Sequence, residues 1–147
     1  VVLHGKKLCG ILTESSLLPD GSAAWLVVGI GVNVGQASFP PDIADMATSL
    51  ALQELDVSPD ALADAILAQL TAMRTVLTDP AEWLAEYRRR CVNLGRPVRV
   101  LRGNTVRQAT ALAIDEQFGL TVQYENGETE TVRSGEVSVR GLYGYIE

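Results

Sequence analysis

The side chains best suited to chemistry gather around a glycine-containing stretch, residues 25–35. Gly29 and Gly31 alternate, so both project toward one face of an extended strand, and that face lacks a side chain at two positions. Asn33 follows two residues later and offers hydrogen-bond donors and an acceptor. A ligand could lie directly on such a backbone surface, so we interpret the stretch as the floor of a small-molecule site.

The paired glycines can also be read as a nucleotide-binding motif or as a β-bulge. A dinucleotide-binding G-x-G-x-x-G motif would need glycine where the sequence has Val34, with a helix directly afterwards. Pro40 and Pro41 follow closely and exclude a phosphate-binding helix start there. A β-bulge in an ordinary core strand is supported equally well by the spacing and stays open.

The neighbouring elements are expected to bring a lysine to this floor. The apolar run at 25–28 predicts a strand buried on both faces. A turn at 18–22 returns the chain from a strand over 8–14. Gly10 should therefore lie on the strand adjacent to the paired glycines, with Lys7 near one end.

Composition excludes several classes of protein. The chain has 147 residues, 47% of them hydrophobic, and a net charge of −6 with dispersed acidic residues, which argues against nucleic-acid binding. Its apolar runs are too short to span a membrane. Cys9 and Cys91 stand apart with only His4 as a further soft ligand, which argues against a metal cluster or disulfide framework and favours a reducing, cytoplasmic setting.

The amino terminus begins as if in mid-strand. Residues 1–3 are apolar, with no initiator methionine or signal peptide, and are expected to pair with 8–14 around His4 and Gly5. We expect the natural polypeptide to be longer, and this sequence to be its second half.

Helices are expected after a long loop. Residues 35–50 form either a lid over the site or a simple crossover. Ser58 and Pro59 start an amphipathic helix that runs to about Leu77. A second helix over 80–90 ends in three arginines, which we interpret as a solvated helix end.

From about residue 95 the hydrophobic period changes from helical to two. Glycine-containing turns separate five short apolar runs, and Asn126-Gly127 is the strongest hairpin signal. Five short strands in so few residues predict a small closed barrel. The expected strands are 98–101, 105–114, 120–124, 129–132 and 137–140.

Four motifs together resemble the second half of a bacterial biotin protein ligase. They are the segments 5–14, 28–33, 47–50 and 134–140. The resemblance implies an α+β fold: a mixed or antiparallel sheet with helices, as in the C-terminal part of the catalytic domain shared with class II aminoacyl-tRNA synthetases, over residues 1–94. A small SH3-like β-barrel over 95–147 would follow. The family's phosphate loop and its contacts to the biotin ureido ring are expected upstream of Val1.

The resemblance also implies an activity. Such enzymes form biotinyl-5′-adenylate from biotin and MgATP, and then transfer biotin to a lysine of the biotin carboxyl carrier domain of an acetyl-CoA or other acyl-CoA carboxylase. Biotin, ATP and Mg²⁺ are therefore the expected small-molecule partners, and homodimerisation is left open. No membrane or nucleic-acid partner is expected through these residues.

The family's site residues carry over onto matching positions. Lys7 resembles the catalytic lysine that reaches the biotin carboxylate and the α-phosphate, whereas Lys6 should face solvent. The segment 36–49 resembles a loop that orders over the adenylate, and no metal ligand is assigned. The biotin-binding set comprises Lys7, Gly10, Ile11, Leu12, Gly29, Ile30 and Gly31. The ATP- or adenylate-binding set comprises Asn33, Ala47, Arg99, Glu136 and Arg140.

Two alternatives stay open from the sequence. A lipoate-protein ligase-like enzyme shares the catalytic fold and the adenylation chemistry, although the terminal barrel and the Gly-Ile-Gly-Val-Asn strand favour biotin. A non-catalytic protein would use the SH3-like module at 95–147 only to bind a protein partner.

Overall fold

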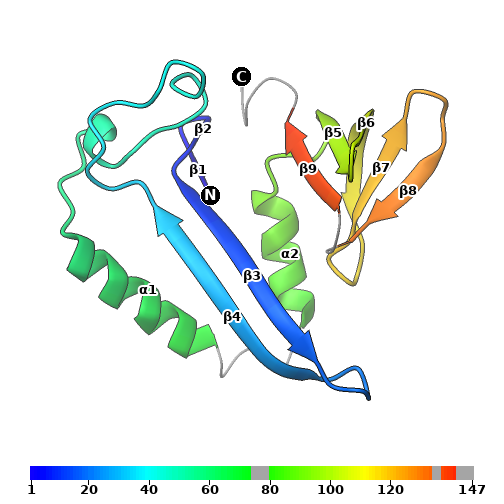
Figure 1. Cartoon of the computed structure of the whole chain (residues 1–147), viewed down its shortest axis with the longest axis horizontal. Helices are drawn as coiled ribbons and strands as arrows, with labels where there is room; N and C mark the ends of the chain where they lie inside the picture. Colours follow the sequence, from blue (N-terminus) through cyan, green and yellow to red (C-terminus); the bar gives the residue numbers. More distant parts are fainter. Residues whose placement is uncertain (74–79, 134–136, 142–147) are drawn as a thin grey trace. The chain divides into compact units, whose positions relative to one another are not determined.

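A computed structural model describes residues 1–73, 80–133 and 137–141 (Figure 1). Its contacts divide the chain into two compact units, residues 1–63 and 64–147. The sequence-based boundary at 94/95 stays a prediction. No helix in the described part of the chain is long and apolar enough to cross a membrane.

The first unit opens with a hairpin that is tighter than the sequence predicts. Strand β1 (Val2–Leu3) pairs with β2 (Lys6–Lys7) around the expected turn at His4 and Gly5, so the second strand begins two residues before the expected segment 8–14. Of the expected segment, Leu8 and Cys9 N–H donate to the Val1 carbonyl. His4 and Gly5 both have positive φ, 46° and 78°, as a two-residue type I′ turn requires. Because this turn closes so tightly, the partner of β1 comes from residues immediately after it.

A long antiparallel hairpin follows, and it is the largest element of the first unit (Figure 1). Strand β3 (Cys9–Leu17) pairs with β4 (Ala23–Val32). The expected turn between them is confirmed, since Leu18 N–H donates to the Ser22 carbonyl and Gly21 has φ of 83°. The hairpin pairs with no further strand in the described part of the chain.

The expected burial of the central strand is wrong for this chain. Trp25, Leu26 and Val27 on β4 are 52%, 60% and 55% exposed, and Leu12 on β3 is 67% exposed. A strand is buried on both faces only when other elements cover both faces of its sheet. Within the first unit nothing buries the two faces of this two-stranded hairpin.

After β4 the chain passes through a segment without regular structure, 33–46, into a buried stretch at 47–50 and a 3₁₀ turn, η1 (Ala51–Gln53). Helix α1 (Pro59–Met73) starts where Ser58 and Pro59 predict, and the Ser58 carbonyl accepts from Leu62 N–H. Helix α1 crosses the boundary between the two units. The expected end near Leu77 lies outside the described residues.

The second unit contains α2 (Pro80–Arg90) and five strands close to the positions expected from sequence. These strands are β5 (Pro97–Arg102), β6 (Thr105–Ile114), β7 (Leu120–Tyr124), β8 (Thr129–Val132) and β9 (Val137–Gly141). Inward-facing residues on successive strands form its core: Val98, Val100, Ala109, Ala111, Val122, Tyr124 and Val132.

The five strands pair in the order β8-β7-β6-β5-β9, with every neighbour antiparallel. Closure into a barrel would need a ladder between the two edge strands, β8 and β9. No such ladder occurs in the described part of the chain, so the predicted closed SH3-like barrel is not found. Figure 1 shows this sheet as an open, strongly twisted set of arrows.

Helix α2 is attached to this sheet through its last turns. The Arg88 guanidinium donates twice to the Ile114 carbonyl, at 2.9 and 2.6 Å. The Tyr87 and Phe118 rings meet edge to face, with centroids 5.6 Å apart. The expected solvated helix end holds for Arg89 and Arg90, which pair with Glu86 at the surface, but not for Arg88.

Candidate functional site

The glycines of the two long strands lie directly opposite one another. Gly10 pairs with Gly31, and Leu12 pairs with Gly29, so these four residues share one face of the hairpin. This arrangement confirms the predicted adjacency of Gly10 and the paired glycines. The backbone of both strands is therefore bare over a continuous area.

The alternative of a β-bulge at the paired glycines, which the sequence left open, is excluded by the register of the two strands. Pairing runs without a shift from Cys9–Val32 to Ser16–Trp25, and the one irregularity lies beyond, at Ser16/Leu17. A side-chain carbon at Gly31 would meet only the Gly10 carbonyl oxygen, at 4.0 Å, and one at Gly29 only the Leu12 carbonyl oxygen, at 3.7 Å. The contacts of this chain thus do not require glycine at either position.

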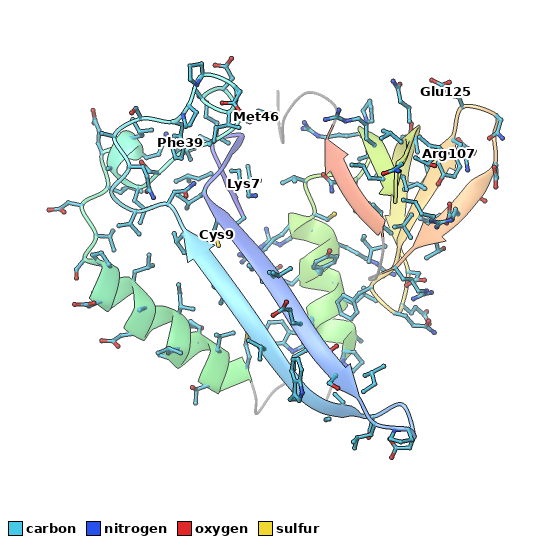
Figure 2. All side chains as sticks on the ribbon, in the orientation of Figure 1. Lys7, Cys9, Phe39, Met46, Arg107 and Glu125 are labelled. Atoms are coloured by element: carbon cyan, nitrogen blue, oxygen red, sulfur yellow. The ribbon has the colours of Figure 1, made fainter. Side chains whose placement is uncertain are left out.

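Lys7 stands at the end of this bare face. Its side chain is exposed, and both its Cε and Nζ lie 3.7 Å from the position that a Gly10 side-chain carbon would take. The ammonium group therefore rests over the glycine backbone. Figure 2 shows Lys7, Phe39 and Met46 at the same end of the β3–β4 hairpin.

The backbone of Lys7 is fixed on both sides. Its N–H donates to the Met46 carbonyl at 2.7 Å, its carbonyl accepts from Thr48 N–H at 3.0 Å, and it forms a parallel bridge with Ala47. The predicted lysine and the predicted Ala47 are thus neighbours in space, although 40 positions separate them in the chain. Residues 46–48 act locally as a short strand beside β2.

Asn33 joins the same cluster by its side-chain amide. Its Nδ2 donates to the Thr48 carbonyl at 3.0 Å and to the Lys7 carbonyl at 3.5 Å. Its backbone N–H donates to the Leu8 carbonyl, and its carbonyl accepts from Leu50 N–H. The described bonds use the amide nitrogen, so the side-chain oxygen is the atom that remains to accept from a ligand.

Beneath these residues lies a polar network that sequence reasoning missed. Thr48 and Ser49 are 1% and 0% exposed. The Ser49 hydroxyl donates to the Gln36 carbonyl at 2.6 Å and accepts from Leu52 N–H, which closes the loop that follows β4. The buried hydroxyls position residues 47–50 because each one has a hydrogen-bond partner.

The same network reaches the β1–β2 turn. The Gln53 amide nitrogen donates to the Thr48 hydroxyl at 3.0 Å, and its oxygen lies 2.6 Å from His4 Nδ1. The only sequence signal for it is the short Ala-Thr-Ser-Leu motif, which does not reveal that its hydroxyls are buried.

Lys6 does not simply face solvent, contrary to expectation. It is half-buried, and its Nζ donates to the Ala44 carbonyl at 3.2 Å. Its side chain does leave β2 on the opposite side from Lys7, as strand alternation predicts. None of the ion pairs found among the described residues involves either lysine.

The remaining predicted nucleotide-site residues belong to the second unit. Arg99 is exposed on β5, and its backbone pairs with that of Arg140 on β9. Nothing is described of the Arg140 side chain, and Glu136 lies outside the described residues. Ile11 and Ile30 pair with each other on the hairpin face opposite the glycines.

No group of three or more His, Cys, Asp and Glu side chains able to hold a metal occurs in the part of the chain that the structure describes. Mg²⁺ is usually held by one or two carboxylates together with substrate phosphates rather than by a dedicated protein cluster. We assign no magnesium ligand to these residues.

Part of the chain is similar in sequence to known proteins. Residues 94–140 match the family "Biotin protein ligase C terminal domain". Bifunctional ligase/repressor BirA of Bacillus spizizenii is 44% identical over 52 residues, which cover 34% of this chain and 16% of that protein. BirA of Bacillus subtilis is 42% identical over a segment of the same length, with the same coverage.

Solved structures extend the similarity over nearly the whole chain. The apo biotin protein ligase of Aquifex aeolicus superposes with a TM-score of 0.75 at 25% identity, over 95% of this chain and 61% of that one. The same enzyme in complex with biotin and ATP gives 0.72 at 25% identity, over 95% and 58%. This chain thus spans about three fifths of the solved ligases it matches. In sequence at residues 94–140 and in fold over 95% of its length, it resembles the C-terminal part of biotin protein ligases.

Proposed function

We propose that this chain is the C-terminal part of an ATP-dependent biotin ligase, which makes biotinyl-5′-adenylate and transfers biotin to a carrier-protein lysine. The observation that carries the proposal is the bare Gly10–Gly31 face with the Lys7 ammonium at its end. It occurs in a fold similar to that of a ligase solved with biotin and ATP.

The bare face suits the flat ring system of biotin. Gly10, Gly29 and Gly31 leave backbone uncovered, and Leu12 on the same face adds an apolar side chain for the valeryl tail. The family resemblance also assigns Ile11 and Ile30 to this site. Both side chains lie on the opposite face of the hairpin, so we assign them a structural role in β3 and β4 rather than direct contact with biotin.

In the first step, a biotin carboxylate oxygen bonds to the α-phosphorus of ATP, and the bond from that phosphorus to the bridging oxygen breaks to release pyrophosphate. Negative charge builds on the α-phosphate oxygens as this happens. The Lys7 ammonium stabilises that charge, because its backbone is fixed by Met46 and Thr48 before any ligand arrives.

Asn33 and Ala47 are the residues we assign to the nucleotide. The Asn33 amide nitrogen already holds Lys7 and Thr48 together, which leaves its oxygen to accept from the adenine amino group. Ala47 is buried beside Lys7, where it would line the floor under the nucleotide. Within the segment 36–49, which the family resemblance assigns to the adenylate, residues 36–46 would close over it and keep water from the reactive anhydride.

In the second step, the amine of the carrier lysine attacks the acyl carbonyl, an amide bond forms, and AMP leaves. We propose a biotin carboxyl carrier domain of an acetyl-CoA or other acyl-CoA carboxylase as acceptor. Arg99, Glu136 and Arg140 remain candidates for contacts to ATP or to this carrier. Cys9 and Cys91 are free thiols, which suits a cytoplasmic enzyme.

The apolar faces of β3 and β4 support a site completed by residues outside this sequence. Ile11 and Val27 are 58% and 55% exposed, and the chain matches only about three fifths of the solved ligases. Exposed apolar area of this extent is typical of a surface that another element covers. Magnesium would enter with the nucleotide phosphates rather than through these residues.

The experiment is mass spectrometry after incubation with biotin, ATP and Mg²⁺. It should be carried out on the 147-residue chain and on a form that includes the coding sequence preceding Val1. We expect biotinyl-adenylate from the longer form and little from the shorter one. Adenylate from neither folded form would contradict the proposal and favour a non-catalytic binding module. Adenylate formed from lipoate in preference to biotin would favour a lipoate ligase.

A further inference from the structure

Lys6 and Lys7 are the only lysines in the sequence, and they are used differently. They are adjacent on β2, so their side chains leave the strand in opposite directions. Lys7 lies over Gly10, whereas Lys6 reaches the Ala44 carbonyl. The two ammonium groups therefore act on different parts of the first unit.

The segment that Lys6 reaches is a compact turn built by its own backbone. Ile43 N–H donates to the Pro40 carbonyl at 3.0 Å, and Met46 and Ala47 N–H groups both donate to the Ile43 carbonyl at 2.9 Å. Ile43 and Met46 nevertheless remain 38% and 42% exposed. The turn is thus preformed locally but is not fixed by burial.

Few hydrogen bonds join this turn to the rest of the unit. Lys7 N–H holds its end through the Met46 carbonyl. In the described part of the chain, the bond from Lys6 is the only side-chain hydrogen bond that reaches residues 37–46. A bond from a charged donor is stronger than one between neutral groups, and this one is partly shielded from solvent.

We propose that Lys6 is a positioning residue that holds the turn at 40–46 beside Lys7, so that the turn retains the nucleotide and the acyl-adenylate. The retention of nucleotide and acyl-adenylate rests on the proposed function. Lys7 stabilises the charge that develops in the reaction, and Lys6 sets how long the turn stays closed over the bound molecules.

The first test needs no ligand. Hydrogen exchange at the backbone amides of 42–47 is compared among the unaltered chain, Lys6→Met and Lys6→Arg. Methionine keeps the apolar stem but removes the donor, whereas arginine keeps charge and donors. We expect about five-fold faster exchange in Lys6→Met and recovery in Lys6→Arg. Lys7→Met is the matched control, and it should leave these amides unchanged because its side chain lies over Gly10.

Unchanged hydrogen exchange at amides 42–47 in Lys6→Met, or an equal increase in Lys7→Met, would overturn the proposal that Lys6 holds the turn. Faster exchange throughout β3 and β4 would also overturn it, because the substitution would then have loosened the whole unit.

The second test uses the form that includes the coding sequence preceding Val1. In adenylate formation, Lys6→Met should raise KM for ATP about five-fold and change kcat by less than about two-fold, with faster loss of bound adenylate. Lys6→Arg should restore both. A fall in kcat at unchanged KM would overturn the positioning role. Absence of adenylate from the unaltered protein would count against the proposed function. The hydrogen-exchange result alone would then decide whether Lys6 holds the turn at 40–46.

Discussion

The Lys7 side chain lies within van der Waals contact of the position that a Gly10 side-chain carbon would take, because its Cε and Nζ are both 3.7 Å from that position. Gly10 in turn pairs with Gly31 across the hairpin. The ammonium group and the bare backbone are therefore one surface. A change to either part should be felt at the other.

Replacing Lys7 tests its proposed role in charge stabilisation. Lys7→Ala should slow adenylate formation by about 100-fold or more, since removal of one such donor raises a barrier by roughly 3 kcal/mol. Its side chain is exposed and its backbone bonds survive the change, so the unfolding midpoint should move little. Single-turnover measurements of adenylate on the form that includes the coding sequence preceding Val1, with parallel urea unfolding, check both statements. Near-normal turnover would remove Lys7 from the mechanism.

Filling the bare face tests the biotin site. In the form that includes the coding sequence preceding Val1, Gly31→Val should abolish biotin binding in calorimetry. The fold should tolerate the change, because the new Cβ would lie 4.0 Å from the Gly10 carbonyl oxygen. Val28→Ile is the matched control, because it enlarges a side chain on the opposite face of β4. Equal affinity in Gly31→Val and the unaltered protein would mean that no ligand lies on this face.

Asn33 should matter for the fold before any nucleotide binds. Asn33→Ala removes the donor to the Thr48 and Lys7 carbonyls and should cost about 1 kcal/mol in unfolding free energy. Asn33→Asp should cost more, because a carboxylate would face the same two carbonyl oxygens. Urea unfolding of the chain without ligand makes the measurement. Identical unfolding midpoints for the unaltered chain and both variants would show that the Asn33 side-chain hydrogen bonds do not stabilise the fold.

The β6–β7 turn offers a test of packing in the second unit. A side-chain carbon at Gly119 would lie 2.6 Å from Thr131 Cγ2 and 3.0 Å from Asp115 Oδ2. Gly119→Ala should therefore destabilise the chain by about 1–3 kcal/mol. Thr131→Ala removes the closest atom, so the double variant should recover part of the loss. A double-mutant cycle in urea gives the coupling, and full additivity would contradict the clash.

Asp115 should make this turn sensitive to acid. Its carboxylate accepts hydrogen bonds from Gly119 and Gln117 N–H groups and pairs with Arg133, and the Gly119 bond above all holds its pKa below the ordinary 3.8. A pKa lowered by folding adds stability at pH values above 3.8, and this stability is lost as pH falls through the folded-state pKa.

The matched variant is Asp115→Asn, which keeps the acceptor oxygen but removes the charge. At neutral pH it should unfold at lower urea than the unaltered chain, and the gap should narrow as pH falls below 3.8. A gap that widens in acid would contradict the assigned direction of the pKa shift.

Local signals are sufficient for much of this fold. The sequence predicts the five strands of the second unit to within two residues at each end, because glycine-containing turns bracket each apolar run. The turn at 18–22 likewise predicts that Gly10 lies beside the glycines of β4. Turn chemistry is read from adjacent residues, so one sequence is enough to locate it.

The misses share a different cause. The apolar run in β4 indicates burial, but whether an element covers it depends on residues elsewhere, and in this chain it is exposed. The turn at His4 and Gly5 lies where the sequence predicts it, but the strand that pairs with β1 begins at Lys6 rather than at Leu8. Alternation predicts that Lys6 leaves the strand opposite Lys7, but its acceptor lies 38 positions away. Barrel closure also depends on distant strands.

The order of the five-stranded sheet has a consequence for synthesis on the ribosome. Strand β5 ends at Arg102, and its outer neighbour β9 begins only at Val137. Because the ribosome adds about 5–20 residues per second, β9 is synthesised a few seconds after β5. During that interval the outer amides and carbonyls of β5 form an open edge that another nascent chain could pair with. Slow codons between these strands should therefore lower the soluble yield more than slow codons after β9.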